Sequence, residues 1–148
     1  QGQWARLLAP ETLLIVRGEL QLANDALVPA EQLRLGGAFG PRGYRQDRLL
    51  TDNGLLATAE LRYPLYSNPV QRQLLQLTPF LDFGGGWNSA GPDPDESLLA
   101  SFGLGLLWQQ PSLSARLDWG IPLNRVERIG ESAQENGIYF SLVFQPTF

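Results

Sequence analysis

Apolar side chains recur at every second position along six stretches of this chain, and this alternation limits the possible fold more than any other feature. In residues 113–123, LSARLDWGIPL, apolar residues alternate with serine, arginine, aspartate and glycine. A period of two places successive side chains on opposite faces of a β-strand, whereas a helix requires a period near 3.6. The same pattern runs through residues 12–23, 55–66, 74–87, 98–109 and 137–148. The sequence therefore predicts an all-β, antiparallel fold with one apolar and one polar face.

The predicted strands are long, and their connections alternate between short and long. Each strand covers about 10 to 12 residues, whereas strands of soluble proteins usually have about 5 or 6 and a tilted strand needs about 9 to 11 to cross a bilayer. Short turns at 67–73 and 110–112 contrast with long polar segments at 24–53, 88–97 and 124–136. This layout is typical of an outer-membrane β-barrel. A soluble antiparallel sandwich is the alternative, but its polar face should be rich in Lys and Thr rather than in paired charges and glycines.

Composition excludes several classes of protein. The 148 residues include no Cys and no His, and they carry a net charge of −4. Without thiols and imidazoles there is no disulfide, no common zinc site and no His-based triad, so we expect no metal, no cofactor and no enzymatic activity. The acidic balance disfavours a nucleic-acid partner, because such partners are held through Lys and Arg contacts to phosphates. No apolar run approaches the roughly 20 residues of a membrane helix.

Charged side chains on the polar faces predict a water-filled lumen. The inward set combines opposite charges from several strands: Arg17, Glu19, Glu60, Arg62, Arg116 and Asp118, with Tyr66 on the same face. The outward set, expected to face lipid, comprises Leu104, Leu106, Leu117, Trp119, Leu142 and Phe144. The inward charges either solvate and cross-link the wall, which we favour, or contact a substrate directly. A glycosidase would also use paired carboxylates, but no other feature of a sugar cleft accompanies Glu60 and Asp118.

The chain is predicted to form a single unit, residues 1–148, without an internal repeat or a linker. Six spanning strands and a possible half strand at residues 3–8 are fewer than the eight or so of the smallest common closed barrels. Open strand edges cannot face lipid, because their backbone groups would lack hydrogen-bond partners. We therefore expect either that the protein continues upstream of Gln1 or that several copies pair edge to edge.

Several motifs occur in an order that resembles a known family. LGGAFGPRGYRQD at 35–47, PFLDFGGGWN at 79–88, SARLDWGIPL at 114–123 and ENGIYFSLVFQPTF at 135–148 are the main ones. They resemble the C-terminal part of two-partner secretion transporters, the hemolysin-activation and filamentous-hemagglutinin type members of the Omp85 superfamily. The resemblance covers nearly the whole chain. It implies the C-terminal part of a 16-stranded transmembrane barrel, preceded by a plug helix and two periplasmic POTRA domains, in the outer membrane of a Gram-negative-type cell envelope.

In that family one long extracellular loop folds back into the barrel, and the resemblance assigns this loop to residues 24–53. The loop tip matches Arg42, Gly43 and Tyr44, with Pro41 where the family usually has a valine or isoleucine. The resemblance implies that the arginine pairs with the aspartate of an F-x-D-x-G strand motif. Here that motif comprises Phe80, Asp82 and Gly84.

The residue types at this loop tip suit the expected contact. A guanidinium can hold a carboxylate through two parallel hydrogen bonds, so we expect Arg42 to lie within hydrogen-bond reach of Asp82. Glycine at position 43 permits a tight turn. We expect Tyr44 to pack against the inner wall near one of the strand glycines, which are Gly84, Gly86 and Gly103.

The resemblance implies passage of an unfolded polypeptide, the secreted exoprotein partner, through a pore across the outer membrane. Two alternatives stay open: an assembly factor of the same superfamily that inserts other barrels, and a passive diffusion porin. The chain ends in Phe148 after an alternating aromatic strand, which resembles the signal that barrel assembly machinery reads. We expect deletion of Phe148 to lower the amount of membrane-inserted protein. The expected partners are therefore the exoprotein, outer-membrane lipid and that machinery.

Overall fold

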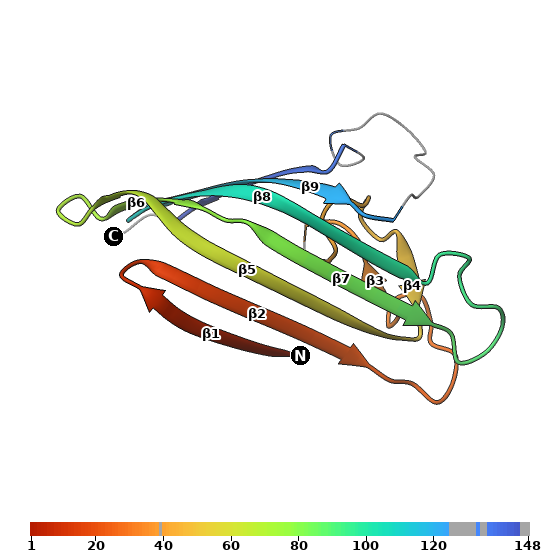
Figure 1. Cartoon of the computed structure of the whole chain (residues 1–148). Helices are drawn as coiled ribbons and strands as arrows, with labels where there is room; N and C mark the ends of the chain where they lie inside the picture. Colours follow the sequence, from red (N-terminus) through yellow and green to blue (C-terminus); the bar gives the residue numbers. More distant parts are fainter. Residues whose placement is uncertain (39, 125–132, 134–135, 146–148) are drawn as a thin grey trace.

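A computed structural model describes residues 1–38, 40–124, 133 and 136–145 of the chain. They form one curved antiparallel sheet with a small two-stranded sheet beside it (Figure 1). The large sheet contains β1 (Gly2–Ala9), β2 (Thr12–Gln21), β5 (Asn53–Asn68), β6 (Gln73–Leu77), β7 (Phe80–Trp87), β8 (Leu98–Gln110), β9 (Leu113–Pro122) and β10 (Ile138–Phe144). The small sheet pairs β3 (Leu33–Leu35) with β4 (Leu49–Thr51). The predicted all-β antiparallel fold is confirmed.

The order of strands in the large sheet is β1-β2-β5-β6-β8-β9-β10, and β7 also lies between β5 and β8. Connections of a few residues join the strands at one end, and the long segments 22–52 and 88–97 leave from the other end (Figure 1). Short and long connections therefore alternate as the sequence predicted. Among the described residues, no helix is long and apolar enough to cross a membrane.

Two strands differ from their predicted extent. The half strand expected at residues 3–8 is a full strand, β1, which pairs with β2 from Gly2 to Ala9. The single strand expected at 74–87 is interrupted at Thr78 and Pro79, because proline has no N–H to donate to a ladder. Thr78 nevertheless exchanges both backbone hydrogen bonds with Gly105 of β8, so β6 and β7 follow one line along the sheet.

The predicted inward position of Tyr66 is wrong. A β-bulge between Pro64 and Tyr66 inserts an extra residue into β5 and reverses the alternation beyond it. Tyr66 therefore stacks on Trp108, with ring centroids 6.4 Å apart and planes inclined by 16°. Both rings lie near the end of the sheet that carries the short turns, and aromatic residues are common at such membrane–water interfaces.

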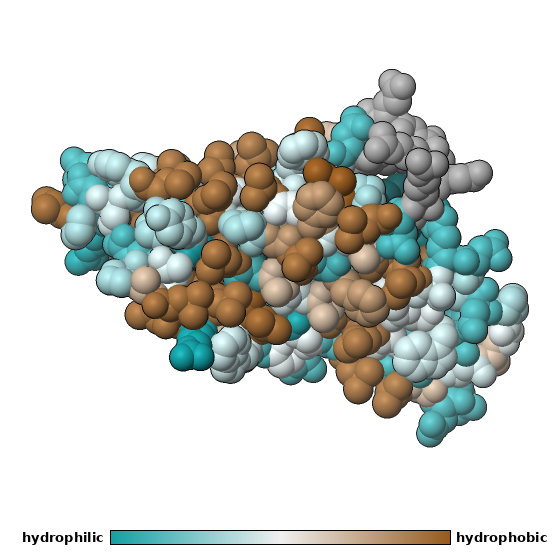
Figure 2. All heavy atoms as spheres, in the orientation of Figure 1, coloured by the Kyte–Doolittle hydropathy of each residue, from teal (hydrophilic) through white to brown (hydrophobic). Residues whose placement is uncertain are grey.

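The two faces of the sheet differ in chemistry as the alternation predicted. All six residues expected to face lipid are exposed; they are Leu104, Leu106, Leu117, Trp119, Leu142 and Phe144. Figure 2 shows apolar side chains gathered across the middle of the sheet, with hydrophilic ones concentrated toward its two ends. Exposed apolar surface of this extent marks an interaction with an apolar environment, and a belt between polar ends matches a barrel wall.

The long segment 22–52 covers the opposite, inner face of the sheet. It contributes three buried leucines from β3 and β4, together with Tyr44, to a small apolar core that also contains Leu99 of β8. This core consists of Leu33, Leu35, Tyr44, Leu49 and Leu99, with Leu56 of β5 packed against it. The segment that the sequence assigned to an inward-folding loop, residues 24–53, therefore lies against the wall and is held there by apolar contacts.

The first and last strands are the edges of the sheet. Within the described residues, β1 pairs only with β2, and β10 pairs only with β9. The sheet is thus an open wall, as expected from its small number of strands. Phe148, predicted to belong to an assembly signal, lies outside the described residues.

Candidate functional site

The tip of the inward loop reaches the inner face through a tight backbone turn. Gly43 adopts a φ of 101°, a conformation that residues with a side chain rarely adopt. Its backbone lies so close to β9 that a Cβ atom on Gly120 would be 2.6 Å from the Gly43 nitrogen. Pro41 fills the space above Gly84, where an added Cβ atom would be 2.8 Å from the proline ring. Glycines in both the loop and the wall therefore permit this close approach.

Arg42 lies directly against Asp82, as the sequence predicted for this pair. Its Nε and Nη2 atoms donate to the two carboxylate oxygens at 2.7 and 2.9 Å, and its backbone N–H donates to Oδ2 at 3.0 Å. The guanidinium carbon also lies 3.4 Å from the centre of the Phe80 ring. Both charged side chains are buried, so their mutual hydrogen bonds replace the water that each has lost.

Two further carboxylates face the same guanidinium. Arg42 Nη1 lies 3.2 Å from Glu60 Oε2 and 3.7 Å from Asp118 Oδ1. Burial disfavours the charged form of Arg42, but the hydrogen bonds and attraction from Asp82, and then the attraction from Asp118 and Glu60, hold the pKa of Arg42 above its ordinary value. The loop tip therefore stays cationic.

Two wall arginines complete the network around these carboxylates. Arg116 Nη2 lies 2.6 Å from Glu60 Oε2, and its Nε lies 2.6 Å from Asp118 Oδ2. Arg62 Nε lies 3.0 Å from Glu60 Oε1. The three arginines Arg42, Arg62 and Arg116 thus face the three carboxylates Glu60, Asp82 and Asp118. Charge is balanced within the cluster only while the loop tip is in place.

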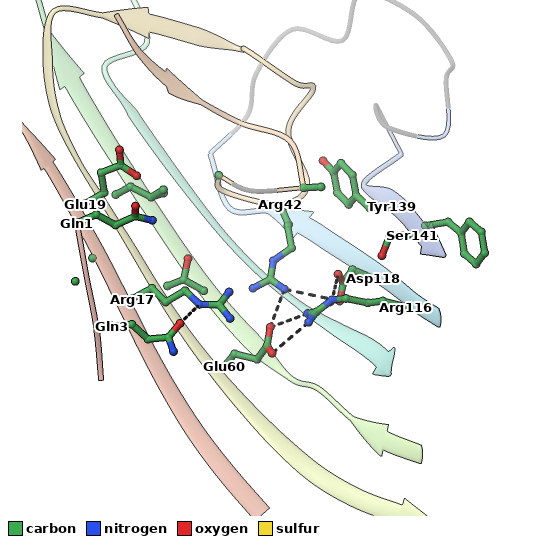
Figure 3. Close-up of a pocket in the computed structure, with 17 residues that line it drawn as sticks. Gln1, Gln3, Arg17, Glu19, Arg42, Glu60, Arg116, Asp118, Tyr139 and Ser141 are labelled. Carbon is green, nitrogen blue, oxygen red and sulfur yellow. Dashed lines mark hydrogen bonds and ion pairs between the residues drawn. The ribbon is translucent and has the colours of Figure 1, made fainter. Parts of the chain in front are cut away.

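The remaining predicted lumen charges, Arg17 and Glu19, lie on another part of the wall. Arg17 Nε donates to Gln3 Oε1 at 2.8 Å, so β1 and β2 are joined on the inner face. Figure 3 shows Arg42 between this region and the pair Arg116 and Asp118. An open hollow of about 680 Å³ is lined by the side chains named in this paragraph, which are Gln3, Arg17, Glu19, Arg42, Arg116 and Asp118. The predicted set therefore divides into an ion-pair cluster beneath the tip and separate polar groups across the hollow.

Tyr44 is buried against the inner wall, and the side-chain atoms nearest to the three expected glycines belong to other residues. Its hydroxyl donates to the carbonyl of Ala100 at 2.7 Å and accepts from the backbone N–H of Ala100 at 3.2 Å. The expected places are already filled by other side chains: Pro41 above Gly84, Thr51 at Gly86 and Phe80 at Gly103.

A hydroxyl from the last strand also holds the tip, and the sequence pattern did not predict this contact. Tyr139 of β10 donates to the carbonyl of Tyr44 at 2.6 Å and accepts from the N–H of Gly43 at 3.0 Å. Alternation does place Tyr139 on the inner face. Its role was not recognisable because both partners are backbone atoms, which leave no mark on the sequence.

A second unpredicted cluster fastens the loop at its base. The Asp52 carboxylate accepts from the side-chain amide of Gln32 at 2.9 Å and from the backbone N–H groups of Leu27 and Ser89, both at 3.0 Å. These hydrogen bonds, with that from Gln32 first, hold the pKa of Asp52 below its ordinary value. Ser89 belongs to the connection 88–97, so the cluster joins the two long connections at the rim of the sheet.

A curved antiparallel wall that is apolar outside, charged inside and covered by an inserted loop is typical of part of a membrane-spanning β-barrel. The family model described as the Omp85 superfamily domain matches residues 17–143. The chain belongs to the Omp85 superfamily.

A solved structure has the same fold, and it is entitled "The crystal structure of BamA from Haemophilus ducreyi lacking POTRA domains 1-3". The TM-score is 0.63 at 17% sequence identity, and the match covers 95% of this chain. The chain spans only 32% of that structure, so it corresponds to part of a barrel. No curated protein matches the chain by sequence.

Proposed function

We propose that this chain is part of an outer-membrane pore that passes an unfolded exoprotein, as in two-partner secretion, in a Gram-negative-type cell envelope. The main support for the proposal is the position of the loop tip. Arg42 holds it against the inner face of the wall through contacts with Asp82, Glu60 and Asp118. The motif order, with the tip at 41–44 and the strand motif at 80–84, supports the two-partner type within the superfamily.

The chemistry of the inner face suits a polypeptide. Its hollow is lined by both carboxylates and guanidinium groups, together with Tyr139 and Ser141. Such groups can hydrogen-bond to the backbone of an extended chain without selecting a particular sequence. The tip is bound to Asp82, Glu60, Asp118 and Tyr139 through hydrogen bonds and ion pairs. Water or a passing chain can make the same kinds of contact when the tip leaves.

Insertion of other barrels into the outer membrane is a second candidate, and membership of the Omp85 superfamily supports it equally. A passive diffusion porin is a weaker candidate. Such a pore requires a polar lumen, but it does not require a loop whose buried arginine completes the charge balance of the wall.

The two leading candidates differ in what fails when the tip is released. We would express the complete protein in cells with its co-encoded exoprotein and replace Arg42 by Ala. Arg34→Ala is the matched control, because Arg34 is an exposed loop arginine that pairs with Asp47. For secretion, Arg42→Ala lowers exoprotein in the medium while other outer-membrane barrels stay at normal levels. Loss of those barrels before any loss of exoprotein would instead support the assembly factor.

A further inference from the structure

The last strand has one buried residue, and that residue faces the loop tip. Within β10, Tyr139 is 8% exposed, whereas every other residue from Ile138 to Phe144 is exposed. Figure 3 shows the ring of Tyr139 pointing toward the loop that carries Arg42. The strand therefore has little apolar burial of its own on the inner face, and its main inward contact is with the tip.

The Tyr139 hydroxyl fixes the backbone of the tip rather than a side chain. It accepts from the Gly43 N–H at 3.0 Å and donates to the Tyr44 carbonyl at 2.6 Å. Within the described part of the chain, this hydroxyl is the hydrogen-bond acceptor for the Gly43 N–H. A buried N–H without a partner is costly, because it has given up its bond to water. The geometry of the tip thus depends on a group supplied by β10.

The same region of the tip lies directly over the pairing between β9 and β10. A Cβ atom on Gly120 would be 2.6 Å from Arg42 carbonyl carbon and from Gly43 nitrogen. Gly120 also donates its N–H to the carbonyl of Gly137 at 2.8 Å, at the start of the β9–β10 ladder. The tip therefore contacts both partners of the last strand pair at one place.

The last strand is one of the two edges of the sheet, where a strand has support from one side only. Among the residues that the structure describes, β10 pairs with β9 alone, and its outward side chains are exposed. Residues of this kind open locally at low cost, because few buried contacts oppose the opening. A contact that bridges the tip and β10 therefore contributes to the stability of both.

We propose that Tyr139 is a positioning residue that couples the seating of the loop tip to the pairing of β10 on β9. The coupling is reciprocal by thermodynamic necessity: a seated tip stabilises β10, and a paired β10 stabilises the seated tip. In transport, which rests on the function proposed above, displacement of β10 releases the tip from the lumen, and withdrawal of the tip loosens β10.

Hydrogen–deuterium exchange of the complete membrane-inserted protein, followed by mass spectrometry, tests both directions. Tyr139→Phe removes only the hydroxyl, and Tyr63→Phe is the matched control because Tyr63 lies exposed on the outward face of β5. Tyr139→Phe accelerates exchange of the Gly43 amide by about 5- to 150-fold, the range expected for one lost buried hydrogen bond. Tyr63→Phe leaves that exchange unchanged.

The effect of the tip on β10 is tested with a variant that releases the tip. Arg42→Ala releases the tip and accelerates exchange in β10. Exchange in β2 keeps its original rate, because among the described residues the tip binds Asp82, Glu60, Ala100 and Tyr139 and no residue of β2. This arm tests the proposal even where Tyr139→Phe reduces insertion. Unchanged β10 exchange in Arg42→Ala overturns the coupling, and so does equal acceleration in β2 and β10, which would indicate general loosening. Exchange is measured without cargo, so a failure of the secretion proposal leaves this result intact.

Discussion

Removing the Arg42 side chain should release the loop tip, because the buried Asp82 carboxylate then keeps only the hydrogen bond from the backbone N–H of residue 42. Among the described residues, every hydrogen bond to the Asp82 carboxylate comes from Arg42. The Asp82 side chain is 0% exposed, so water cannot replace the lost donors while the tip stays in place. Breaking a buried pair by removing one partner costs about 3 to 5 kcal/mol. Glu60, in contrast, retains Arg62 and Arg116.

Replacing Asp82 should destabilise the seated tip less than replacing Arg42. In Asp82→Asn, Arg42 keeps its ion pairs with Glu60 and Asp118 and loses only the charge-assisted part of its bonds to position 82. Hydrogen bonds to charged groups contribute about 1.5 to 3 kcal/mol each. The double variant Arg42→Ala with Asp82→Asn contains no stranded carboxylate at position 82. The loss of tip stability in this double variant should therefore be no greater than the loss in Arg42→Ala alone.

Exchange of the Gly43 amide measures how often the tip leaves the wall. A loss of about 3 to 5 kcal/mol, at about 1.4 kcal/mol per factor of ten, accelerates this exchange by roughly 10² to 10³ or more. Heat-dependent mobility on gels checks that the barrel remains folded, and the exoprotein in the medium reports transport. The control Arg34→Ala should change exchange little, because an exposed pair contributes at most about 1 kcal/mol. If the free-energy losses of the two single variants add up strictly in the double variant, Arg42 and Asp82 act independently and the proposed pair is refuted.

Three further predictions concern the turn, the outer face and the rim. Gly43→Ala should release the tip, because a φ of 101° disfavours a side chain by about 1 to 2 kcal/mol and the backbone of β9 lies against Gly43. The control Gly91→Ala, which is also at positive φ but in open space, should not affect transport. Leu117→Arg should destabilise the inserted barrel by about 2 to 4 kcal/mol if Leu117 lies at mid-membrane, whereas Val28→Arg in the exposed loop should not, as denaturant titration in micelles will show. Asp52 has a folded-state pKa below its ordinary 3.8, so its stabilisation of the rim is present above pH 3.8 and is lost as the pH falls through the lower, folded value. Asp52→Asn should remove this pH dependence of loop protection, measured by exchange corrected for intrinsic rates.

The sequence by itself determined which face of each strand is apolar and which is polar. This was possible because the pleat of a strand turns successive side chains to opposite faces, whatever the rest of the chain does. Leu117 and Trp119 were therefore assigned correctly to the outer face, and Asp118 between them to the inner face. The pairing of Arg42 with Asp82 was predictable for a different reason, since both residues belong to motifs whose order resembles a family.

The tertiary structure decided everything that depends on distance rather than on alternation. A bulge beside Pro64 moved Tyr66 to the outer face. A proline is compatible with a bulge, but the pairing of β5 with β6 decides where the extra residue falls.

The contacts of the tip were hidden for the same reason. Arg42 reaches Glu60 as well as Asp82, and Tyr139 holds backbone atoms 95 and 96 positions earlier in the chain. These partners become neighbours only when the sheet curves and the loop is packed over its small residues. Their proximity is a property of the assembled wall, because the backbone groups that Tyr139 binds are chemically the same at nearly every position of the sequence.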